Sequence, residues 1–139
     1  MREIKFRAWN PDNPNHDQRM VINPLFRCDA KDVLNKESIY KNWTLMQYTC
    51  LKDKNGLEIY EGDIIEFDEE HQGAVVLELY TDAETYADID HLGYIVKYMS
   101  GEYETRATLP DVARVGCVIG NIYEHPNLLG LTIDFLPKL

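Results

Sequence analysis

Apolar and polar residues alternate along several short segments of this chain. The alternation is clearest at Glu3–Trp9, Trp43–Thr49 and Gly73–Tyr80. A period of two places successive side chains on opposite faces of an extended backbone, so these segments are predicted strands. The same reasoning predicts further strands at Arg19–Ile22, Leu57–Tyr60, Ile64–Phe67, Gly93–Met99, Tyr103–Thr108 and Val115–Tyr123.

Turn signals separate these strands. Asn55-Gly56 lies between two extended segments, and both residue types accept positive φ, so we predict a type I′ hairpin turn. Glu61-Gly62-Asp63 predicts a second tight turn or bulge, in which the Asp63 side chain hydrogen-bonds the backbone around Gly62. The glycines at 116 and 120 predict bends or bulges within the strand that they interrupt.

Short strands at intervals of about 8–12 residues are typical of an antiparallel barrel or sandwich. Parallel βαβ units need intervening helices of about 10–15 residues, which the pattern lacks. We therefore predict a mainly β fold with few short helices, with a β-rich α+β fold as the alternative. One domain is expected over residues 1–139. Residues 10–42 form a loop or helix appendage in this prediction, and residues 127–139 form a packing tail.

Charge is unevenly distributed along the chain. Residues 1–54 carry a net charge of +3 and residues 55–139 a net charge of −13, which gives −10 in total. An acidic protein repels a phosphate backbone, so direct binding of nucleic acid is disfavoured. The alternative is a local basic patch near the N-terminus, formed by Arg2, Lys5, Arg7, Arg19 and Lys52.

Hydropathy and cysteine usage bear on the compartment. No segment approaches the roughly 20 apolar residues of a membrane helix, and the first residues lack the apolar stretch of a signal peptide. Cys28, Cys50 and Cys117 are scattered, which fits a reducing compartment and small buried side chains. We expect a cytoplasmic protein without membrane contact.

Three segments resemble the YopX family of phage and prophage proteins. They are REIKFRAW (Arg2–Trp9), LMQYTCLKDKNGLEIYEGDII (Leu45–Ile65) and VIGNIYEHPNLL (Val118–Leu129), in the family's order. The resemblance implies a phage or prophage gene expressed in a bacterial host, a small β-containing domain and a homo-oligomer. It implies no reaction and no catalytic residues. The family pattern has glycine where this chain has Cys50, which would suggest an unusual backbone angle or close packing there.

Chemical motifs are absent from the sequence. No histidine pair has a metal-binding spacing, and no phosphate-binding or nucleophile motif occurs. We therefore predict no catalytic residue, no cofactor and no metal ligand, and favour a non-enzymatic protein. The alternative is a metal-dependent enzyme that uses the carboxylates and imidazoles of Asp68–His71 or Asp88–His91.

Tyrosine and acidic residues are mixed in the second half of the chain. Tyrosine is enriched at protein interfaces because its body is apolar and its tip is polar. The favoured hypothesis is thus an accessory protein that self-associates and binds a host or phage protein. Its predicted binding surface consists of Tyr80, Glu84, Tyr86, Asp88, Asp90, Tyr94, Tyr98 and Tyr103. The alternative is a solvated sheet surface with cross-strand tyrosine pairs.

Overall fold

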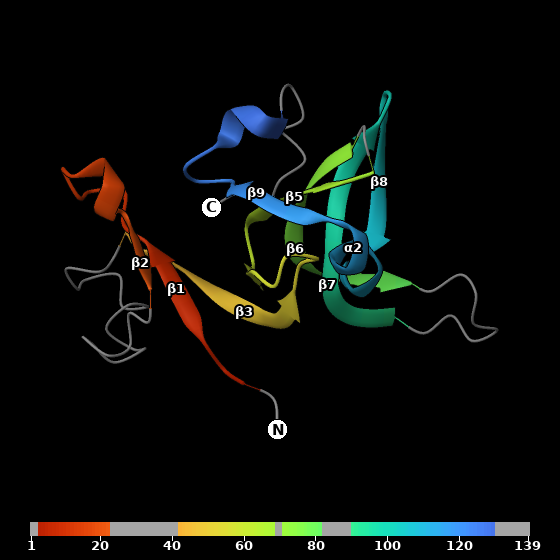
Figure 1. Cartoon of the computed structure of the whole chain (residues 1–139), viewed down its shortest axis with the longest axis horizontal. Coiled ribbons are helices and arrows are strands. Elements are labelled where there is room, and N and C mark those ends of the chain that lie inside the picture. Colours follow the sequence, from red (N-terminus) through yellow and green to blue (C-terminus); the bar gives the residue numbers. More distant parts are fainter. Residues whose placement is uncertain (1–2, 23–41, 69–70, 82–89, 130–139) are drawn as a thin grey trace.

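A computed structural model describes residues 3–22, 42–68, 71–81 and 90–129 of the chain (Figure 1). The described residues form two antiparallel sheets, so the predicted mainly β fold is confirmed. None of the helices in this part of the chain is long and apolar enough to cross a bilayer. Residues 23–41 of the predicted appendage lie outside the described residues, and the predicted tail is described only as far as Leu129.

The first sheet has the strand order β2-β1-β3-β4. Its strands are β1 (Phe6–Trp9), β2 (Met20–Ile22), β3 (Thr44–Lys52) and β4 (Glu58–Tyr60), with a 3-10 turn, η1 (His16–Gln18), between β1 and β2. Figure 1 shows β1, β2 and the beginning of β3 to one side of the remaining strands. We call β1, β2 and residues 44–48 the arm.

The second sheet has the strand order β8-β7-β6-β5-β9 and curls into a half-barrel, which we call the body. Its strands are β5 (Asp63–Phe67), β6 (His71–Thr81), β7 (Asp90–Ser100), β8 (Tyr103–Thr108) and β9 (Cys117–Asn121). The helix α2 (Leu109–Val115) connects β8 to β9 and agrees with the prediction of few short helices. Pro110 lies in its first turn, where a missing N–H costs no helical hydrogen bond.

The main core lies between the body sheet and α2. Leu109, Val112 and Ala113 of the helix pack against Val75 and Val96 of the sheet, and all five are buried. Burial of each large aliphatic side chain stabilises the fold by about 1.5–3 kcal/mol. This core fixes the body, against which the arm is then placed.

The arm turns one face towards the body. In the antiparallel ladder Arg7 lies directly between Ile22 on β2 and Met46 on β3, so these three side chains share a face. Trp9 and Thr44, two residues further along, share the same face because side chains alternate along a strand. The sheet register therefore directs a cation and an aromatic ring to the same side.

The hairpin between β3 and β4 corrects the predicted turn type. Gly56 has a φ of 84°, but Asn55 does not have positive φ, so the type I′ prediction is wrong. The Gly56 N–H instead donates to the Asp53 carbonyl at 3.0 Å, in a turn followed by a left-handed glycine. The Asp53 carboxylate favours this geometry because it accepts the N–H groups of Asn55 and Leu57, each at 2.9 Å.

A bulge in β3 explains why the family pattern has glycine where this chain has Cys50. Tyr48 pairs with Tyr60 and Lys52 pairs with Glu58, so β3 contains two more residues than its partner between these pairs. Cys50 lies in this bulge with a φ of 68°. A side chain at positive φ is strained, whereas glycine adopts this conformation readily.

Candidate functional site

The turn Glu61-Gly62-Asp63 is the point where the arm meets the body, and it confirms the tight turn predicted there. Gly62 has a φ of 84°, donates its N–H to the Val75 carbonyl and accepts the N–H of Ile122, both at 2.8 Å. A Cβ atom at position 62 would lie 3.3 Å from the Met46 sulfur, tighter than ordinary contact. Glycine is thus required by both angle and space, and the turn joins β4 and β5 to β6 and the chain after β9.

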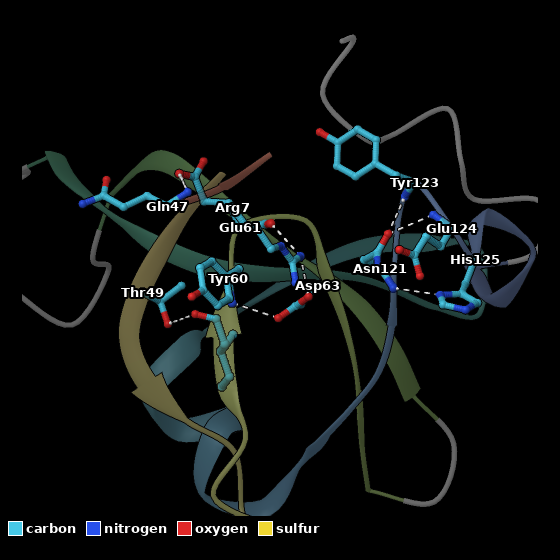
Figure 2. Close-up of polar contacts among 11 residues, drawn as sticks. Arg7, Gln47, Thr49, Tyr60, Glu61, Asp63, Asn121, Tyr123, Glu124 and His125 are labelled. Atoms are coloured by element: carbon cyan, nitrogen blue, oxygen red, sulfur yellow. Dashed lines mark hydrogen bonds and ion pairs between the residues drawn. The ribbon is translucent and has the colours of Figure 1, made fainter. Parts of the chain in front are cut away.

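A buried ion pair lies on one side of this turn. The Arg7 guanidinium donates to Asp63 Oδ1 at 2.6 Å, and the two side chains are 10% and 2% exposed. Asp63 Oδ2 also accepts the Tyr60 N–H at 2.8 Å, and Arg7 lies 4.8 Å from the centre of the Tyr60 ring (Figure 2). Burial raises the pKa of the Asp63 carboxyl, an effect that the Arg7 charge opposes. The pair holds β1 of the arm against the beginning of β5.

The neighbouring carboxylate, Glu61, is half-buried and has no cation partner among the described residues. Its Oε1 accepts the backbone N–H of Gln47 at 3.1 Å (Figure 2). Arg7 reaches only the backbone carbonyl of Glu61, at 3.3 Å. Burial raises the pKa of Glu61, and the Gln47 N–H partly opposes that rise. Within the described residues, no ion pair involves the Glu61 side chain.

Glu61 borders a cavity between the arm and the body, which we call the junction pocket. Its volume is about 250 Å³. Apolar side chains from β3, β6 and the segment after β9 provide most of its wall. The lining residues are Thr44, Leu45, Met46, Glu61, Gly62, Val75, Val76, Leu77, Ile122 and Tyr123.

Tyr123 forms the aromatic part of this wall. Its ring stacks against Trp9 of the arm, with ring centres 5.8 Å apart and planes 26° apart. Burial, together with the nearby Glu61 carboxylate, raises the pKa of Tyr123 to about 12, so its hydroxyl is neutral at physiological pH. The Asn121 side chain fixes the backbone here by accepting the N–H groups of Tyr123 and Glu124 at 3.0 and 2.8 Å (Figure 2).

The tyrosines of the sequence-predicted binding surface occupy several environments. Tyr94 and Tyr98 are partly buried against the main core, and Tyr98 contacts the Phe67 ring edge-on at 4.9 Å. Tyr103 is 79% exposed at the start of β8. None of these three lines the junction pocket.

The other predicted surface residues lie in or beside the segment at 82–89. Tyr80 and Asp90 belong to the paired ends of β6 and β7, but their side chains are not described. Glu84, Tyr86 and Asp88 lie outside the described residues. The binding surface inferred from tyrosine and acidic residues therefore stays a prediction.

The predicted metal and nucleic-acid residues are also only partly described. His71 Nδ1 lies 2.8 Å from Asp68 Oδ2, and the described residues contain no group of three or more side chains able to hold a metal ion. Of the basic residues, Lys5 pairs with Glu58 and Arg7 is buried against Asp63. Two of the five proposed phosphate contacts are thus engaged with carboxylates.

One family model and one solved structure match this chain over most of its length. A family model described as YopX protein matches residues 5–130, and the chain belongs to the YopX family. Among solved structures, protein EF1440 from Enterococcus faecalis is 22% identical, with a TM-score of 0.43 over 93% of this chain and 99% of that one. No curated protein matches the chain.

The three segments that carry the family resemblance meet around the turn Glu61-Gly62-Asp63, beside the junction pocket. Arg7 and Trp9 come from the first, Glu61 and Asp63 from the second and Tyr123 from the third. From the sequence alone, Arg7 is a candidate phosphate contact, and a strand and turn explain Glu58–Asp63 more readily than a recognition surface does. The sequence does show that Arg7 and Asp63 lie in two of the family segments. It does not show that they pair, because their contact depends on the tertiary structure.

Proposed function

We propose that this chain is a non-catalytic protein-binding module of phage or prophage origin, and that the junction pocket is its docking site. The observation that carries the proposal is an open pocket between two sheets, with apolar walls and one half-buried carboxylate. Partly apolar cavities with few polar groups are typical of recognition sites. The second and third family segments line the pocket, and the first packs beside it through the contacts of Arg7 with Asp63 and of Trp9 with Tyr123.

Three of the polar groups at or beside the pocket, Tyr123, Arg7 and Asp63, favour binding over catalysis. General acid–base chemistry needs groups that can exchange protons near the working pH. The raised pKa of Tyr123, about 12, keeps its proton in place. Arg7 and Asp63 are buried and neutralise one another, so they cannot also act on a substrate in solution.

The volume of the pocket supports a macromolecular partner. About 250 Å³ is smaller than the roughly 300–1,000 Å³ of pockets that enclose a small-molecule ligand. One protruding side chain fits such a space, with the rest of the partner lying across the rim. The net charge of −10 favours a basic partner by electrostatic attraction. We therefore propose a positively charged segment of another protein as the occupant.

Selection of peptides from a displayed random library tests this proposal. Leu77 is 44% exposed at the pocket rim, so Leu77→Trp would fill the entrance without disturbing the core. Val115 is 61% exposed at the end of α2 and outside the pocket lining, so Val115→Trp is a matched control. Selected peptides should bind Leu77→Trp about tenfold more weakly than wild type, since about 1.4 kcal/mol is lost. Equal binding to both variants, or no enriched peptide, contradicts the pocket as docking site.

Self-association is a separate proposal. It is supported by two exposed isoleucines, Ile4 just before β1 and Ile22 at the end of β2, whose exposed fractions are 70% and 59%. Exposed apolar side chains of this kind gain free energy when a second copy covers them. Size-exclusion chromatography with light scattering should give an oligomer that Ile22→Lys dissociates. A monomer at tens of micromolar wild-type protein contradicts this proposal.

A further inference from the structure

We infer that the junction pocket binds a lysine or arginine side chain of the partner, with the Glu61 carboxylate as its ionic contact. This inference rests on the proposed protein-binding function and adds the chemistry of the anchoring residue. It depends on three properties of the pocket, which are a carboxylate with no cation among the residues that the structure describes, the apolar walls and the charge of the surroundings.

The Glu61 carboxylate is less compensated than the carboxylates near it. Asp63 has Arg7, Glu58 has Lys5, and Glu78 on the body has both Lys97 and Arg106. Glu61 has one backbone N–H on Oε1, and its other oxygen has no partner among the described residues. A half-buried carboxylate gains from a cation because attraction is stronger where water is partly excluded.

The walls of the pocket suit the stem of a basic side chain. Lysine and arginine carry three or four methylene groups below the charged end, and these groups favour apolar surroundings. Met46, Val76 and Ile122 supply such surroundings. The ring of Tyr123 adds a favourable contact for a cation, since aromatic faces attract positive charge.

The charges around the pocket disfavour an acidic side chain as the occupant. Arg7 is the cation nearest to the turn, but its guanidinium is directed to Asp63 and to the Glu61 backbone carbonyl. Among the described residues that line the pocket, Glu61 is the only charged one. An acidic side chain entering the pocket would therefore meet a carboxylate of the same charge with no cation in the described lining to offset it.

Titration of the full chain with blocked pentapeptides, followed by amide NMR shifts, tests the inference. The peptides carry lysine, norleucine or glutamate between flanking glycines, so lysine and norleucine differ chiefly in charge. The lysine peptide should shift the amides of Gly62, Val76 and Ile122 saturably. Norleucine should bind about tenfold more weakly, as expected for loss of a charge-assisted contact, and glutamate more weakly still.

Two variants, each with a matched control, connect the effect to Glu61. Glu61→Gln should weaken lysine-peptide binding about tenfold. Glu124→Gln removes an exposed charge that does not line the pocket and should leave the affinity within about twofold, as expected for a screened surface charge. Leu77→Lys gives a second test at an exposed position, because its ammonium would compete for Glu61. It should also weaken binding, whereas Val115→Lys should not.

The possible results separate this inference from the proposed function. Equal affinities for the lysine and norleucine peptides, or unchanged affinity in both Glu61→Gln and Leu77→Lys, overturn the basic anchor. If peptides selected from the library still require an open pocket, the docking site stands without that anchor. If no peptide perturbs the pocket and the selection also fails, the proposed function fails together with the inference.

Discussion

Arg7 and Asp63 form a buried ion pair across 56 residues of sequence, with 2.6 Å between guanidinium nitrogen and carboxylate oxygen. One residue belongs to the arm and the other to the first strand of the body. The same turn that places Asp63 against Arg7 leaves Glu61, at the junction pocket, with no cation from the described part of the chain. Architecture and proposed binding chemistry therefore depend on the same three-residue turn.

Loss of Arg7 is predicted to destabilise the fold strongly. Arg7→Met leaves Asp63 buried without its cation, which should cost about 3–5 kcal/mol in the free energy of unfolding. Arg7→Met combined with Asp63→Asn should recover part of this loss, because the asparagine oxygen still accepts the Tyr60 N–H. Urea denaturation measures all three proteins.

The ion pair of Arg114 with Asp111 provides the matched control for this comparison. Their nitrogen and oxygen atoms are 3.0 Å apart, but the side chains are 78% and 71% exposed. Arg114→Met should leave the free energy of unfolding nearly unchanged, because exposed ion pairs contribute little. A loss as small as this for Arg7→Met would show that the buried pair does not hold the arm.

Replacement of Cys50 by glycine is predicted to stabilise the chain. Cys50 has a φ of 68°, a conformation that costs a residue with a side chain about 1–2 kcal/mol. Glycine has no side chain and relieves this strain, so part of that free energy is gained as stability. The melting temperature should rise by about 3 °C for a net gain near 1 kcal/mol. Cys117→Gly in β9, where φ is not positive, should instead lower the melting temperature. A lower melting temperature for Cys50→Gly would contradict the strain.

Asp53→Asn is predicted to disconnect the hairpin from β9. Asp53 Oδ2 accepts the Val118 N–H at 2.8 Å, while Oδ1 accepts the Asn55 and Leu57 N–H groups. Burial opposes ionisation of Asp53, but these three N–H groups lower its pKa overall. An asparagine can keep the Oδ1 contacts but presents a donor to Val118. Amide hydrogen exchange should therefore speed up at Val118 and stay slow at Leu57. An equal loss of protection at both amides would contradict the separate roles of Oδ1 and Oδ2.

Stability is predicted to depend on pH through Glu61. Burial raises its pKa above the ordinary 4.5, so the folded chain binds the proton more tightly than the unfolded chain. The contribution of Glu61 is thus most favourable below the unfolded pKa and is lost as the pH rises through the folded pKa. The free energy of unfolding of wild type minus that of Glu61→Gln should fall across this window. A difference in the free energy of unfolding that is constant, or that rises with pH, would show that burial does not raise the pKa of Glu61.

Local sequence pattern predicted the strands because side-chain alternation is itself a local property. It failed at the hairpin turn, where the side chain of Asp53 selects a backbone that Asn55-Gly56 alone does not indicate. The glycine in the family pattern indicated an unusual angle at Cys50, and its φ of 68° accounts for that signal. The junction pocket could not be predicted, because no single segment contains it and its charge depends on which carboxylate Arg7 reaches.

The pKa of Glu61, measured from its side-chain carboxyl carbon by NMR with and without saturating lysine pentapeptide, tests the central claim most directly. Without peptide, the pKa should lie above 4.5 because of burial. With peptide, it should fall by about one unit or more, because an ammonium group within about 4–6 Å stabilises the carboxylate. A pKa that does not change while the peptide is bound would contradict Glu61 as the ionic contact of the junction pocket.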